Sequence, residues 1–407
     1  MAKRAIVLGV LHSMTEVLQP GVTVNIVGSG SSVGGSTTIV TPPSGGGGGN
    51  TIERFDTIAV FNSAEPHGFY SGNTVTITGA DQAEYNVVGA TVTVITPDCF
   101  AFQVANTAAS PATGTIEVAF VANGPKTRAN RLVAMRPIAN LVLGYDLDTP
   151  SPVTLSDNND TGPDYSLASF IAVNQTVDTA YVINTNTPRE ILEVDIGATP
   201  GPRTSFVALP SSSNTGIVVD SVNQRVIWSE NQRVQMRDIG GSTTTELVDP
   251  ADPLVVATIT DMVMDYKRGR LLFLQDNTGL FAVDFATTTV TTISNSDGGI
   301  PNSALPENDT TTRGLTLDAE TDTAYALAAV GDTIISYNVN TGIRSDFAAV
   351  DSARSYHSLA LDKANNRILC SDTSSADIIY AFDLDDGSRT SFDTAQDLVF
   401  GIALDAV

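Results

Sequence analysis

The chain has 407 residues, with 21 lysines and arginines against 45 aspartates and glutamates, which gives a formal net charge of −24. A surface this acidic repels phosphate groups, so neither nucleic-acid binding nor attraction to anionic lipid is expected. Hydrophobic residues make up 42% of the chain and charged residues 16%, which excludes a charge-driven disordered protein. No apolar run is long enough to predict membrane insertion.

The composition predicts an all-β protein. Thr, Val, Asp, Asn, Ser and Gly are abundant, as is typical of strands and turns, and no long stretch repeats its apolar residues with a helical period. The two cysteines, Cys99 and Cys370, lie far apart in the sequence and are predicted to be free thiols. Two isolated thiols cannot form a metal cluster, and we expect no metal or other cofactor.

The first part of the chain is interpreted as an arm and a tether. Residues 1–27 are predicted to form an N-terminal arm with strands at 5–11 and 22–27. Residues 28–51 are rich in Gly and Ser, which is typical of a linker. We expect the arm and linker to hold the chain in a homo-oligomer and against other proteins of an assembly.

Residues 52–122 are predicted to form a small β-sandwich or barrel-like domain. Alternating apolar strands are expected at 74–79, 90–95, 100–104 and 115–121, with glycine-containing turns between them. The predicted core consists of Val75, Ile77, Val92, Val94, Phe100, Phe102, Ile116 and Val118.

One string in this domain, HGFYSGNTVTITGADQAEYN at residues 67–86, resembles a small β module of bacteriophage tail, baseplate and fibre proteins. The matching positions are His67, Gly68, Gly72, Val75, Ile77, Gly79, Tyr85 and Asn86. The resemblance implies a structural component of a virion. Apart from this resemblance, His67 is interpreted as part of the turn structure.

Residues 129–407 contain a repeat in which an apolar strand ends in an acidic or amide residue, followed by a turn and a second apolar strand. The units lie at 170–183, 216–228, 261–274, 314–327 and 358–370, and a further one begins at 401–407. Their landmark residues are Asn174, Asp220, Asp265, Asp318, Asp362 and Asp405. The landmarks recur about every 45 residues, which is typical of a four-stranded β-propeller blade.

The two ends of this repeat region complement each other. Residues 129–156 align with 364–392 and carry the second, third and fourth strands of a blade, whereas 401–407 carries only a first strand. Joining them predicts one blade built from both ends and six blades in total. The region therefore resembles the six-bladed β-propeller class that includes NHL-like repeats.

The landmark residues are interpreted as structural, because a carboxylate at the end of a strand can accept hydrogen bonds from the N–H groups of the next turn. Functional groups are expected at the channel mouth, about five residues before each landmark. The candidate ligand-binding residues are Thr215, Thr260, Asp261, Arg313 and His357. The alternative is that Arg313 pairs with Asp261 in solvent and that His357 is an ordinary turn residue.

Nothing in the sequence predicts catalytic residues. No H-E-x-x-H or G-x-x-x-x-G-K-[ST] motif is present, and the three histidines lie in separate regions. We expect a non-enzymatic structural or attachment protein of a phage virion, whose propeller packs in the particle or binds a host glycan or protein. The alternatives are a secreted or periplasmic, metal-dependent lactonase-like hydrolase and a bacterial surface or scaffold protein that uses the propeller as a binding module.

Overall fold

The structure is a computed structural model, and it describes thirteen stretches of the chain. They are residues 39–40, 50–63, 66–120, 130–165, 168–185, 187–210, 215–276, 278–295, 312–328, 333–351, 354–373, 379–393 and 398–405. The predicted arm strands at 5–11 and 22–27 lie outside these residues, as does most of the predicted linker.

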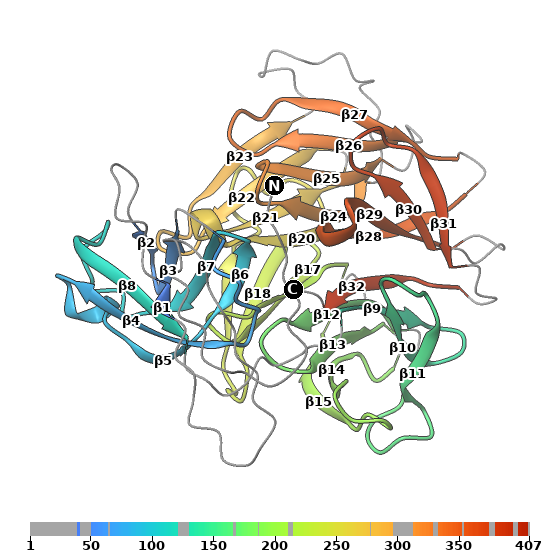
Figure 1. The fold of residues 1–407 in the computed structure, drawn as a ribbon. Helices are drawn as coiled ribbons and strands as arrows, with labels where there is room; N and C mark the ends of the chain where they lie inside the picture. The colour runs from blue at the N-terminus through green and yellow to red at the C-terminus, as the bar shows by residue number, and fades with distance from the viewer. Residues whose placement is uncertain are drawn as a thin grey trace, which may run out of the picture.

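The described residues form eight four-stranded antiparallel sheets, which confirms the all-β prediction (Figure 1). Two sheets belong to the small β domain and six to the propeller. The helical elements of the described chain are three short 3-10 turns, which are η1 (Ala83–Tyr85), η2 (Tyr266–Arg268) and η3 (Lys363–Asn365).

The small β domain is a sandwich of two sheets. One sheet has the order β1 (Ile39–Val40), β8 (Gly114–Phe120), β4 (Thr74–Ala80) and β5 (Val88–Thr91). The other has the order β2 (Thr51–Phe55), β3 (Ile58–Asn62), β7 (Cys99–Gln103) and β6 (Thr93–Thr96). The predicted core residues are buried between the sheets except for Val94, which is half-buried.

Two details of this domain differ from the sequence-based picture. The single strand predicted at 90–95 is two strands in different sheets, because the chain crosses between the sheets at Val92. There the Val92 carbonyl accepts a hydrogen bond from Gly72 N and the Val92 N–H donates to Asn73 O. Ile39 and Val40, inside the predicted linker, pair with β8 and extend its sheet.

The propeller consists of six blades, numbered here in chain order. Blade 1 is β9 (Arg131–Arg136), β10 (Leu141–Asp146), β11 (Pro152–Asp157) and β32 (Gly401–Asp405). Blade 2 is β12 (Ala168–Asn174), β13 (Thr179–Asn184), β14 (Glu190–Asp195) and β15 (Arg203–Ala208). Blade 3 is β16 (Ile217–Asp220), β17 (Arg225–Glu230), β18 (Arg233–Asp238) and β19 (Thr244–Val248).

The remaining blades follow the same pattern. Blade 4 is β20 (Ile259–Asp265), β21 (Arg270–Gln275), β22 (Gly279–Asp284) and β23 (Val290–Asn295). Blade 5 is β24 (Thr312–Asp318), β25 (Thr323–Ala328), β26 (Thr333–Asn338) and β27 (Arg344–Ala349). Blade 6 is β28 (Tyr356–Asp362), β29 (Arg367–Asp372), β30 (Ile379–Asp383) and β31 (Arg389–Asp393).

The ring closes as the sequence predicts. In blade 1, β32 pairs with β9, so that Ile402 lies opposite Ala134 and Leu404 opposite Leu132. Figure 1 shows β32, in red, beside the green strand β9, with β10 on the other side of β9. The six innermost strands contact one another in succession around the ring, from β12 through β16, β20, β24 and β28 to β32 and back to β12.

The landmark residues have the structural role predicted for them. Asp220 Oδ1, for example, accepts hydrogen bonds from Val222 N at 3.2 Å and Asn223 N at 3.0 Å. Asp318 and Asp362 accept the equivalent bonds from the N–H groups that follow them. All six landmark side chains are buried, with at most 2% of their surface exposed.

An arginine that the sequence analysis did not single out completes four of these turns. It lies directly across the first strand pair from the landmark aspartate and binds its carboxylate. The ion pairs are Arg131–Asp405 at 3.0 Å, Arg225–Asp220 at 2.6 Å, Arg270–Asp265 at 2.8 Å and Arg367–Asp362 at 2.7 Å. In three of the four, the guanidinium also donates to a carbonyl of the next blade: Ile196 O, Val339 O or Leu147 O. The arginines therefore link blades as well as strands.

The small β domain packs against the turns that follow the landmarks in blades 3 and 4. Ile58, Val60 and Cys99 share one buried cluster with Val222 of blade 3. The Thr57 hydroxyl donates to Asn223 Oδ1 at 2.8 Å. Gly269, with φ of +59°, lies so close to Phe55 that a Cβ at that position would be only 2.0 Å from the Phe55 Cβ. This face of the propeller is therefore partly covered by the small domain.

Candidate functional site

The candidate site is a cavity of about 590 Å³ along the central channel of the propeller. The inner strands that surround it run in one direction, because residues at equivalent or adjacent positions of neighbouring strands are in contact. Gly216 lies against its equivalent Asp261, and Gly314 lies against Leu359, which follows its equivalent Ser358. Val94 and Ile95 of the small β domain line one end, next to the landmark turns. Thr258, Thr260 and Asp276 line the other, at the beginnings of the strands.

Asp261 is the acidic residue that distinguishes blade 4 at this level of the channel. The equivalent residues, four positions before each landmark, are Phe170, Gly216, Asp261, Gly314, Ser358 and Gly401. The Asp261 carboxylate accepts a hydrogen bond from Met262 N at 2.8 Å and, across the blade junction, from Leu315 N at 2.7 Å. Desolvation in the channel raises the pKa of Asp261 to about 7, against the lowering effect of these two bonds.

Two more polar atoms at this end have no hydrogen-bond partner within the described residues. They are Thr260 Oγ1 and Asp276 Oδ1, and both are buried. Thr260 lies where the pairing of β20 with β21 is irregular, between Ile259 and Asp261. Asp276 follows β21, and its N–H donates to Thr258 O at 2.8 Å. An unpaired polar atom in a cavity wall is a ready partner for a ligand.

His357 is held in place by aromatic neighbours. It is buried on β28, and its ring lies 5.3 Å from the ring of Phe170 and 5.0 Å from that of Phe400. Its Nδ1 is 3.0 Å from Phe400 O. His357 is therefore a strand residue that packs between blades, and its interpretation as a turn residue is wrong.

Four of the five sequence-predicted site residues line the one cavity, namely Thr215, Thr260, Asp261 and His357. The Thr215 hydroxyl donates to Ile259 O, which ties blade 3 to blade 4. Arg313 belongs to β24, with its backbone opposite Leu327, and its side chain lies outside what the structure describes. Its pairing with Asp261 stays a prediction.

Sequence reasoning missed Asp276 as a site residue. Asp276 lies outside the landmark positions of the repeat, so counting from the landmarks cannot find it. The distinction of Asp261, in contrast, is visible in the sequence once the six units are aligned, because three of the units have glycine at its position.

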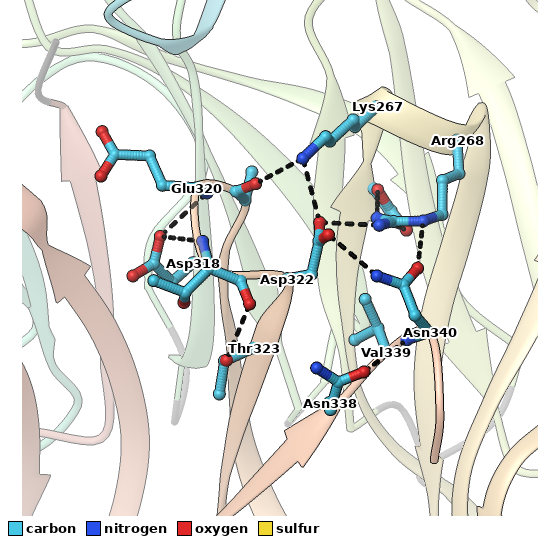
Figure 2. Close-up of polar contacts among 12 residues, drawn as sticks. Lys267, Arg268, Asp318, Glu320, Asp322, Thr323, Asn338, Val339 and Asn340 are labelled. Carbon is cyan, nitrogen blue, oxygen red and sulfur yellow. Dashed lines mark hydrogen bonds and ion pairs between the residues drawn. The ribbon is translucent and has the colours of Figure 1, made fainter. Parts of the chain in front are cut away.

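Charged residues at the opposite end of the channel form a network between blades 4 and 5 (Figure 2). Asp322 is bound by Arg268 at 2.7 Å, by Lys267 at 3.2 Å and by the Asn340 amide at 2.9 Å. Burial acts to raise the pKa of Asp322, but the bonds from Arg268, Asn340 and Lys267 outweigh it and hold the pKa below its ordinary value. The acidic groups of this network are thus paired within the fold.

Lys363 of blade 6 adds a second bridge at this end. Its ammonium group binds Asp318 at 2.7 Å and Glu320 at 3.2 Å, both from blade 5. Burial alone would lower the pKa of Lys363, but the two carboxylates raise it above its ordinary value. Among the residues that the structure describes, no group of three or more His, Cys, Asp or Glu side chains is arranged to hold a metal ion.

Comparisons with known proteins identify the fold and go no further. No family model and no curated protein matches the chain. The structure is similar to a chain from the crystal structure of a nidogen/laminin complex, with a TM-score of 0.55, 14% identity, and coverage of 68% of this chain and 98% of that one. TolB from Acinetobacter baumannii is also similar, with a TM-score of 0.49, 14% identity, and coverage of 69% and 67%.

The protein is thus a β-propeller protein. Identities this low show the fold alone. The resemblance of residues 67–86 to phage modules has no support in these comparisons and stays a prediction. Within the described stretches, no helix has the length and apolar character needed to cross a membrane.

Proposed function

We propose that the protein is a binding and scaffold protein, in which the propeller offers a rigid surface to a partner and the small β domain connects it to an assembly. The observation that carries this proposal is that the repeated charged groups pair with one another inside the ring. Each landmark aspartate is bound by an arginine or lysine, so the repeated charges of the ring are committed to holding its strands and blades together.

The small β domain supports the same proposal. It packs on the landmark face of the propeller through apolar residues and fixes the orientation of the two parts. A rigid pair of domains suits a protein that positions one partner relative to another. One of the similar solved propellers comes from a complex of nidogen with laminin, and a protein-binding role for this chain is of the same general kind.

We further propose that the assembly is a phage particle, in which the chain is a tail, baseplate, fibre or decoration component. The resemblance of residues 67–86 supports this assignment, as does the strand Ile39–Val40, which ties the segment before the small domain into its sheet. Mass spectrometry of purified particles tests it. Detection at a stoichiometry comparable to other structural proteins is expected, and absence from the particles would favour the bacterial surface alternative.

The anchoring role proposed for the arm has its own test. Removal of residues 1–27 leaves every described strand in place and is expected to convert an oligomer of the full chain into a monomer. Light scattering coupled to size-exclusion chromatography measures this change. An unchanged oligomeric state would show that other surfaces hold the subunits together.

A hydrolase is the second candidate, because Asp261 and His357 line one cavity. Against it, the His357 ring packs between two phenylalanines with Nδ1 beside the Phe400 carbonyl. Esterase or lactonase turnover that disappears in Asp261→Ala and His357→Ala, together with a stoichiometric metal after dialysis, would favour the enzyme over the scaffold.

A further inference from the structure

The end of the channel next to Thr260 has buried polar groups to which no described residue forms a hydrogen bond. Thr260 Oγ1 and Asp276 Oδ1 are buried without a hydrogen-bond partner among the described residues. Asp261, beside Thr260, is held by two backbone N–H groups. All three residues belong to the first two strands of blade 4 or the turn after them, so one blade supplies the whole group.

This group is acidic and has no cationic partner within the described residues. In the described part of the chain, no lysine, arginine or histidine donates a hydrogen bond to Asp261 or forms an ion pair with it. The remaining titratable residues that line the cavity are Tyr266, Asp276, His357, Asp362 and Lys363. Lys363 is bound to Asp318 and Glu320, and Asp362 to Arg367. Arg313 lies on the neighbouring strand β24, with its side chain outside the described residues.

Apolar residues from most of the inner strands contribute to the walls of the same cavity. Ile217, Met262, Leu315, Leu359 and Ile402 line it from five of the six inner strands. The volume of about 590 Å³ falls within the range of about 300 to 1,000 Å³ typical of small-molecule sites. A cavity with an acidic group at one end and apolar walls is complementary to a ligand with a cationic head and an apolar body.

We propose that the channel binds a small organic ammonium ion, whose N–H groups donate to Asp261, Thr260 and Asp276 and whose apolar body lies along the inner strands. Binding is a reversible association with no covalent step. Charge-assisted hydrogen bonds to carboxylate groups supply the specificity, and burial of the alkyl body supplies much of the affinity. The site is separate from the partner-binding surface proposed above, and either proposal can fail without the other.

The direct test measures binding of n-octylammonium to the full-length protein by calorimetry, with n-octanol and octanoate as probes of equal length. The ammonium ion is expected to bind at least about tenfold more tightly than the alcohol, because it alone offers a positive charge to the carboxylates. Octanoate is expected not to bind. Equal binding of the three probes would overturn the proposal, as would the failure of hexyl-, octyl- and decylammonium to bind.

The variant Asp261→Asn tests whether the Asp261 carboxylate binds the ammonium group. It is expected to weaken octylammonium binding at least about tenfold and to leave octanol binding unchanged. The matched control is Asp385→Asn, which alters an exposed aspartate of blade 6 and is expected to change neither. Unaltered ammonium binding by Asp261→Asn would overturn the assignment.

Thr260→Val distinguishes a ligand contact from a structural role. The substitution removes the unpartnered hydroxyl and keeps the side-chain shape, so the melting temperature is expected to rise or stay constant while octylammonium binding weakens several-fold. A structural residue would lose stability and binding together. Retained affinity in Thr260→Val would remove Thr260 from the site.

Proton release gives an independent readout. With a pKa of about 7, Asp261 is half protonated at pH 7, and a bound cation favours its ionised form. Binding at pH 7 is therefore expected to release about half a proton, measured by calorimetry in buffers of different ionisation enthalpy. Asp261→Asn is expected to abolish the release. Release of the same size from the variant would show that another group carries the linkage.

Discussion

The two ends of the propeller channel use their acidic residues in opposite ways. At the end covered by the small β domain, the carboxylates of Asp318 and Asp322 bind lysine or arginine side chains that link neighbouring blades. At the other end, among the described residues, Asp261 has only backbone donors and Asp276 Oδ1 has no partner. The comparison separates carboxylates that hold the ring together from carboxylates that are available to a ligand.

The largest effect is expected from breaking an ion pair at the paired end. Arg131→Ala leaves the buried Asp405 carboxylate without its guanidinium partner, at the junction that closes the ring. The free energy of unfolding, measured by urea titration, is expected to fall by about 3 to 5 kcal/mol. The control is Arg233→Ala, because Arg233 pairs with Glu246 at the surface at 3.6 Å, where a loss below about 1 kcal/mol is expected. Equal losses would contradict the structural role of the closing pair.

The pH dependence of stability sharpens the comparison at the other end. The pKa of Asp261 rises from 3.8 to about 7 on folding, so the folded state holds this proton more tightly than the unfolded chain. The contribution of Asp261 to stability is therefore fully present below about pH 4 and is lost as the pH rises through about 7. The free energy of unfolding of Asp261→Asn, relative to that of the wild type, is expected to rise by about 1 to 3 kcal/mol from pH 4 to pH 8. A constant difference across this range would show an ordinary pKa for Asp261.

An intermediate effect is expected where neighbouring inner strands approach most closely. Gly314 has φ of +60°, and a Cβ there would be 2.9 Å from Leu359 N. Gly314→Ala is expected to lower the free energy of unfolding by about 2 to 3 kcal/mol, because of backbone strain and the displacement of β28. Gly240 has φ of +77°, and a Cβ there would have no neighbouring atom within 4 Å, so Gly240→Ala measures the strain alone, at about 1 kcal/mol. Thermal unfolding that gives equal losses would contradict tight contact between β24 and β28.

The smallest effect is expected from Lys267→Ala. Asp322 keeps its bonds to Arg268 and Asn340 after this change, and Lys267 is partly exposed. The free energy of unfolding is expected to fall by about 0 to 1 kcal/mol. The fall is expected to be smaller still at high salt, because mobile ions screen exposed pairs. Chemical unfolding at low and high salt measures the difference. A larger, salt-independent loss would place Lys267 among the residues that hold the ring.

The sequence was sufficient to predict the blades because their signal is repeated. The landmark carboxylates and the missing first strand of residues 129–156 establish the period and the closure without any knowledge of packing. The crossing at Val92 was not predictable in the same way, because its apolar alternation continues through 90–95 and only the pairing of β5 and β6 with different partners separates them.

The candidate site was partly predictable for a related reason. Counting back from the landmarks found Thr260 and Asp261 because the inner strands are in register around the ring. Asp276 follows a second strand, close to the irregular pairing of β20 with β21, and it lines the cavity from there. The arginine partner was also predictable for three of the landmarks, since an arginine follows Asp220, Asp265 and Asp362 by five residues. Only the strand pairing shows that the two side chains meet.

The pairing of β32 with β9 has a consequence for biosynthesis. While the ribosome is still translating blades 2 to 6, β9 lacks the neighbour that covers its inner edge, and the salt bridge from Arg131 cannot form. Because Asp405 lies 274 positions after Arg131, ring closure involves contacts of very large sequence separation, which form slowly. The nascent propeller therefore carries an open edge until β32 has been translated, and during that time it is exposed to mispairing and to capture by chaperones.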